Sequence, residues 1–136
     1  MIAVYPTKAQ LDALLAAPEP GPVVMLNLLR FKARASAPDE GLSGEEAYHR
    51  YGGPMRALVE SRGGRFLWVG RITGQVIGEG AEGFQLAALV EYPSRRAFVE
   101  IATSPEVAAL GVHRAAGLEG QWLLAATTGL GGAAAG

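Results

Sequence analysis

The chain has no cysteine, little charge of either sign and few aromatic residues, and each of these absences removes a class of function. Without cysteine there is no disulfide, thiolate nucleophile, zinc finger or iron–sulfur cluster. Its 12 basic residues nearly balance 13 acidic ones, so no long-range field attracts nucleic acid or an anionic membrane. Aromatic residues make up only 7%, and with no basic stripe beside them they predict no base-stacking surface.

Long apolar runs are also missing. The longest, from Val23 to Leu29, is interrupted by Asn27 and is far shorter than the ~20 residues that cross a bilayer. The amino terminus shows no basic segment followed by an apolar one, so we expect no secretory signal. A hydrophobic content of 49% over 136 residues indicates one globular domain. We therefore expect a cytoplasmic protein without nucleic-acid or membrane partners.

Capping motifs and hydrophobic spacing predict the order of the elements. A capping box, in which two side chains at a helix start bond to each other's backbone, is predicted at Thr7–Gln10 and at Ser43–Glu46. Further helices are expected after Ser94 and Ser104. Residues 78–83 match the glycine spacing of a dinucleotide fingerprint, but they join two strands and so predict a hairpin loop. Strands are predicted over residues 23–31, 65–77, 84–92 and 122–127.

After the first helix the predicted order is βαββαβ, which is typical of the ferredoxin-like fold. This is an α+β fold with a four-stranded antiparallel sheet and helices on one face. We expect three segments: an N-terminal helix and linker over residues 1–21, the ferredoxin-like α/β-barrel domain over residues 22–128, and a flexible tail over residues 129–136.

Apolar residues occupy both faces of the predicted strands. In the first strand Leu26 and Leu28 alternate with Met25 and Leu29, whereas a sheet with one face in water alternates apolar with polar residues. Exposing such a face would cost several kcal/mol at about 25 cal/mol per Å². Only the short first helix is left over to cover it. We therefore predict a twofold homodimer with the two sheets packed face to face. Trp68 and Trp122 are expected to lie either in the core or in this dimer interface.

Several segments together resemble the bacterial family catalogued as domain of unknown function 1330. The resemblance covers roughly residues 22–128 and depends on residues 24–31, 48–51, 63–70, 90–94 and 113–119. The chain is more loosely similar to the dimeric α/β-barrel superfamily, which includes cofactor-free monooxygenases, muconolactone isomerases and chlorite dismutase relatives. The resemblance implies a dimer and a pocket between sheet and helices in each subunit. It implies no particular reaction.

Five polar residues are candidates for a ligand site. Asn27 lies mid-strand among apolar residues and must bond either a ligand or a neighbouring element. Arg71 and Arg114 can grip a carboxylate, although each alone is more often part of a structural ion pair. Tyr51 shares a packed helix face and can turn its hydroxyl toward a pocket. His113 is the candidate for catalytic proton transfer, with a structural or exposed histidine as the alternative.

Two functional hypotheses follow from these residues. The first is a dimeric barrel that binds a small organic ligand, an acid being one candidate, with cofactor-free oxygenation or isomerisation as reactions by analogy alone. The second is a non-catalytic binding or assembly module, in which the same polar residues bond one another. His49 and His113 are far apart and have no carboxylate at ligand spacing, so neither a metal site nor a cofactor is expected.

Overall fold

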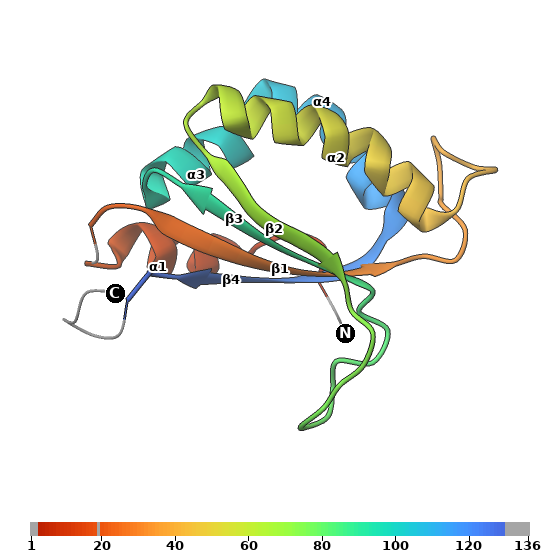
Figure 1. Ribbon diagram of the computed structural model, residues 1–136. Helices are drawn as coiled ribbons and strands as arrows, with labels where there is room; N and C mark the ends of the chain where they lie inside the picture. The colour runs from red at the N-terminus through yellow and green to blue at the C-terminus, as the bar shows by residue number, and fades with distance from the viewer. Residues whose placement is uncertain (1–2, 19, 130–136) are drawn as a thin grey trace.

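Four antiparallel strands form one sheet, and the helices arch over one of its faces (Figure 1). The computed structural model describes residues 3–18 and 20–129. The tail predicted for residues 129–136 therefore lies, beyond Gly129, outside the described residues. In chain order the elements are α1 (Lys8–Ala16), β1 (Val23–Phe31), α2 (Gly44–Ser61), β2 (Arg65–Arg71), β3 (Leu86–Tyr92), α3 (Arg95–Ala102), α4 (Pro105–Gly117) and β4 (Leu118–Ala126).

The strands lie in the order β2–β3–β1–β4, and every neighbouring pair is antiparallel. The central strand β1 pairs Met25 with Val90 of β3 on one side and with Ala125 of β4 on the other. This order, together with the βαββαβ connections, defines the ferredoxin-like fold. The α+β prediction is confirmed.

The helix starts follow the predicted caps. The side chains of Thr7 and Ser43 each accept a hydrogen bond from the backbone N–H three residues on, and the backbone N–H of each cap residue donates to the side-chain oxygen of Gln10 or Glu46. Ser94 and Ser104 cap α3 and α4 by the same side-chain contact. None of the helices in the described residues combines the length and the apolar character needed to cross a membrane.

Three of the four strands differ from their predicted bounds, and β3 differs least, beginning at Leu86 instead of Phe84. β2 ends at Arg71, and residues 72–83 form an arm that extends away from the helices (Figure 1), with Val76 and Ile77 almost fully exposed. The apolar residues of this segment suggested a longer strand, but glycines with positive φ turn the chain there. β4 begins at Leu118 rather than at Trp122, directly where α4 ends.

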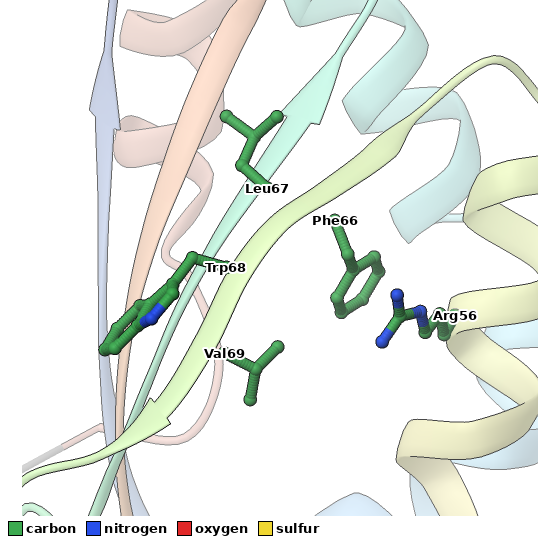
Figure 2. Close-up of a pocket in the computed structure, with 5 residues that line it drawn as sticks. All are labelled: Arg56, Phe66, Leu67, Trp68 and Val69. Atoms are coloured by element: carbon green, nitrogen blue, oxygen red, sulfur yellow. The ribbon is translucent and has the colours of Figure 1, made fainter.

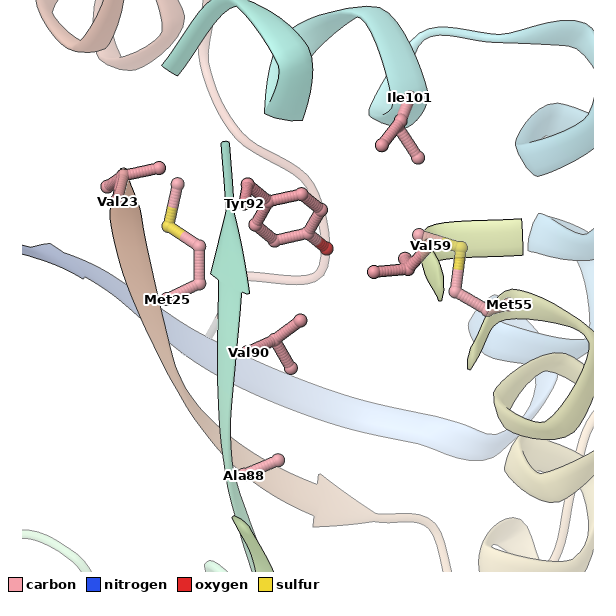
Figure 3. Close-up of a cluster of buried hydrophobic side chains, with 8 residues drawn as sticks. All are labelled: Val23, Met25, Met55, Val59, Ala88, Val90, Tyr92 and Ile101. Atoms are coloured by element: carbon pink, nitrogen blue, oxygen red, sulfur yellow. The ribbon is translucent and has the colours of Figure 1, made fainter. Parts of the chain in front are cut away.

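The main core lies between the sheet and the helices (Figure 3). It contains Val23, Met25, Met55, Val59, Ala88, Val90, Tyr92 and Ile101. Helices α2 and α4 meet through glycines. A Cβ on Gly117 would lie 2.3 Å from the carbonyl oxygen of Gly44, and one on Gly44 would lie 2.1 Å from that of Lys32. Only glycine permits this approach, which holds the two helices at a fixed height above the sheet.

The sheet face away from the helices carries a row of large apolar side chains, which we call the outer face. The strand register places Trp68 beside Leu89, Leu89 beside Leu26, and Leu26 beside Leu124. Trp68 is 52% exposed and Leu124 is 51% exposed. A bulge in β2 turns Trp68 to this face, while Phe66 points toward the helices (Figure 2). Each chain thus has an apolar sheet surface that is open to solvent.

Candidate functional site

A cavity of about 1230 Å³ lies between the sheet and the helices. Its floor is the helix-facing side of the sheet, and α2, α3 and α4 form its roof. Residues 3–6 and helix α1 line a further side, where Leu14 packs against the core. Mostly apolar walls with a few polar groups are typical of small-molecule sites.

A chain of three polar side chains crosses the cavity wall. Gln121 Nε2 donates to Asn27 Oδ1 at 2.8 Å, and Arg114 Nη2 donates to Gln121 Oε1 at 2.6 Å. Asn27 Nδ2 in turn donates to the backbone oxygen of Met25 at 3.2 Å. Asn27 and Gln121 come from neighbouring strands and Arg114 from α4, so the fold brings together residues distant in the sequence.

Three tyrosines project into the same cavity. Tyr48 and Tyr51 lie one helical turn apart on α2 with ring centroids 5.4 Å apart, and Tyr92 lies at the end of β3. Figure 3 shows the Tyr92 ring reaching from the strand toward Val59. Among the described residues, none of the three hydroxyls makes a hydrogen bond.

Burial raises the pKa of each of these tyrosines above its ordinary value. The nearby charge of Arg114 acts in the opposite direction on Tyr48 and Tyr51 but is the weaker effect. All three phenols are therefore neutral at pH 7, and each presents an O–H donor to the cavity.

Two of the predicted site residues lie elsewhere. Arg71 forms a two-pronged ion pair with Glu45, at 2.6 and 3.3 Å, and does not line the cavity. The hydrogen bond and charge of Arg71 lower the pKa of the Glu45 carboxyl. This geometry matches the structural alternative that the sequence left open for Arg71.

His113 is held by a buried carboxylate. Its Nδ1 lies 2.7 Å from Asp39 Oδ2, and Arg50 donates to the other oxygen at 2.8 Å. The Asp39 side chain is fully buried, and the hydrogen bond from His113 is the main cause that lowers its pKa. These three residues join α4, the loop before α2 and α2 itself. His113 is not among the cavity-lining residues.

The structure thus brings together Asn27, Tyr51 and Arg114 but not Arg71 or His113. Sequence reasoning missed Gln121, because the predicted last strand began at Trp122, four residues after the strand begins in the structure. With the strand starting at Leu118, alternation with Leu123 would have placed Gln121 on the cavity face. No local signal could have paired Asp39 with His113, since 74 positions separate them.

Comparison with known families decides where the chain belongs. The model for DUF1330, a domain of unknown function, matches residues 41–128. The chain belongs to this family. The match confirms the resemblance to domain of unknown function 1330 that roughly residues 22–128 show. No curated protein matches the chain.

Two solved structures with TM-scores above 0.8 agree with the fold. A Rhodopseudomonas palustris protein of unknown function is 35% identical, with a TM-score of 0.84 over 93% of this chain and 96% of that one. The structure titled as the methylated form of that protein gives 34% and 0.85, over 96% and 98% of the two chains. A Bacteroides fragilis protein of unknown function, described as dimeric and ferredoxin-like, is 17% identical, with a TM-score of 0.46 over 77% and 94%.

Proposed function

We propose that this DUF1330 protein binds a small organic ligand in the cavity between its sheet and helices, and that it does so as a homodimer. The observation that carries the binding proposal is the set of three tyrosine hydroxyls that face the cavity without a partner among the described residues. The hydroxyls still reach solvent in the free chain, since none of them is among the fully buried, unpaired side-chain atoms of the described residues. A ligand that fills the cavity would bury them, and a buried polar group left unpaired costs about 1–3 kcal/mol. A ligand with oxygen acceptors would supply the partners.

The alternative is a binding or assembly module whose polar residues serve only one another. The bonds among Asn27, Gln121 and Arg114 fit that description, because each side chain has a partner within the chain. The tyrosines do not fit it. Their donors converge on a space with apolar walls, which favours a ligand over a closed internal network.

The dimer proposal depends on the outer face. Trp68, Leu124 and Trp122 are all about half exposed in one chain, and monomeric proteins rarely keep large contiguous apolar patches in water. A second copy presents the same apolar row, so a twofold axis would place the two sheets against each other.

Catalysis in the cavity would need a proton carrier beside the ligand. The reactions that the resemblance implies, oxygenation or isomerisation without a cofactor, require proton transfer at the ligand. His113 remains the proposed proton carrier, but it does not line the cavity and Asp39 engages its Nδ1, so it would have to act through its other ring nitrogen and a bridging water. Once a ligand that turns over is found, turnover unchanged in His113→Ala would remove this role.

A thermal-shift screen of small phenols and carboxylates tests the binding proposal. A ligand at 100 times its Kd stabilises the folded state by about 2.7 kcal/mol. The matched variants lie on α4: Gly111→Phe adds a ring to the cavity wall, and Ala109→Phe adds the same ring on an exposed position outside it. We expect Gly111→Phe alone to lose the stabilisation. Equal loss in both variants, or no stabilisation by any compound, would contradict a site in this cavity.

A further inference from the structure

Arg114 differs from most arginines of the chain in having only neutral partners. Among the described residues its guanidinium donates to the amide oxygen of Gln121 and to the backbone oxygen of Val4. Six other arginines pair with a carboxylate: Arg30 with Glu119, Arg50 with Asp39, Arg56 with Glu60, Arg62 with Glu106, Arg65 with Glu91 and Arg71 with Glu45.

A positive charge without a counter-charge is costly where water is partly excluded. Arg114 is half buried at the cavity wall, and its charge acts on Tyr48 and Tyr51, so these groups face the same space. The cavity therefore combines the guanidinium of Arg114, which bonds neutral oxygens, with several O–H donors and apolar walls. A carboxylate complements this set better than a neutral or basic group, because it accepts from both kinds of donor.

The N-terminal segment at present covers this charge. Arg114 Nη2 bonds the Val4 oxygen at 2.5 Å, and the Gln121 backbone N–H donates to the Ala3 oxygen at 2.9 Å. The Tyr5 ring lies 5.5 Å from the guanidinium carbon, in cation–π geometry. Residues 3–5 thus place a carbonyl oxygen where an anionic oxygen would bind.

We infer that Arg114 is the anion-binding point of the cavity, that the ligand is an apolar carboxylic acid, and that residues 3–5 form a latch which this acid displaces. This inference rests on the proposed ligand-binding function and adds a ligand class and a gate to it. The exchange is favourable because a carboxylate bonds a guanidinium more strongly than a backbone carbonyl does. The latch is weak, because Tyr5 is 63% exposed and α1 buries no residue fully.

Calorimetric titration with phenylbutyrate and with its neutral amide tests the ligand class. We expect the wild type to prefer the acid by about ten-fold. Arg114→Gln should abolish the preference while still binding the amide, and Arg114→Lys should keep part of it. Arg56→Gln is the matched control, since Arg56 also lines the cavity but has Glu60 as a partner and lies over Phe66 (Figure 2). Loss of the preference in Arg56→Gln instead would overturn the assignment.

The latch has its own test, because all four tyrosines of the chain line the cavity. In protein labelled with fluorotyrosine, the fluorine signal of Tyr5 is identified by its absence from Tyr5→Ala. Phenylbutyrate should move this signal toward that of an unfolded tyrosine. Tyr5→Ala should also bind the acid about two- to five-fold more tightly, since it removes a cation–π contact that holds the latch closed.

The possible failures are distinguishable. Equal affinity of the wild type for acid and amide would refute the anion-binding point but leave cavity binding intact. A Tyr5 signal that stays in place while those of Tyr48 and Tyr51 shift would refute the latch alone. Binding of neither probe to any of the folded variants, together with unshifted fluorine signals, would count against the proposed function itself.

Discussion

Replacing Trp68 by serine should dissociate the proposed dimer. Trp68 is 52% exposed in one chain, which corresponds to roughly 130 Å² of an indole residue of about 250 Å². A twofold interface contains the residue twice, so covering it removes about 260 Å² from water and contributes up to about 6 kcal/mol at 25 cal/mol per Å². The Kd of the dimer should therefore rise by up to about 10⁴-fold.

Light scattering over a concentration series measures the effect. The wild type should have twice the 14.2 kDa mass of one chain at micromolar concentration, and Trp68→Ser should approach 14.2 kDa. Leu15→Ser is the control, because Leu15 is an exposed apolar residue of α1, a helix that packs against α3 and the core on the other side of the sheet. Circular dichroism should show folded protein in both variants. A monomeric wild type, or equal dissociation of both variants, would refute the reasoning.

Three further predictions concern the fold and the cavity. Gly117→Ala should lower the free energy of unfolding in urea by at least about 1–3 kcal/mol, because its Cβ would lie 2.3 Å from a backbone oxygen of α2. Gly111→Ala, in the interior of α4 like Gly117 at its end and with a Cβ that would meet nothing within 4 Å, should raise it by about 0.5–1 kcal/mol; the reverse order would contradict the close helix contact. Tyr51→Phe should leave the unfolding free energy within about 0.5 kcal/mol of the wild type because its hydroxyl has no partner among the described residues, whereas a loss of about 1 kcal/mol would reveal one. Asp39→Asn should be less stable than the wild type at neutral pH. The His113 hydrogen bond lowers the pKa of Asp39 from its ordinary value near 3.8. The difference in unfolding free energy between wild type and Asp39→Asn should therefore persist above pH 4 and vanish as the pH falls through the lowered pKa. A difference that grows in acid would exclude the ion pair as its cause.

The fold was predictable because its signals are local. The caps at Thr7 and Ser43 depend on residues three positions apart, and the strand at residues 23–31 on its own composition. Residues 78–83 of the arm were predicted as a hairpin loop, but residues 72–77 were predicted as strand, since Val76 and Ile77 are apolar yet pair with no strand of the described residues. Hydrophobic character alone does not distinguish a strand from an exposed arm.

The candidate site was only partly predictable, because contacts across the fold decide it. Residue type marked Asn27 and Arg114 as candidates, and the structure places both in the cavity. Residue type alone could not tell that Glu45 neutralises Arg71 while Arg114 meets only neutral oxygens. That difference depends on which helix faces which strand.

The distribution of chromophores separates the two proposed events. Both tryptophans of the chain lie on the outer face, and every tyrosine borders the cavity. Tryptophan fluorescence, excited selectively at the red edge of the absorption band, therefore reports subunit association. The near-ultraviolet difference absorbance of the tyrosines reports ligand binding in the cavity. An unlabelled sample thus carries an independent optical reporter for each event, and the order in which assembly and binding occur can be timed in one stopped-flow experiment.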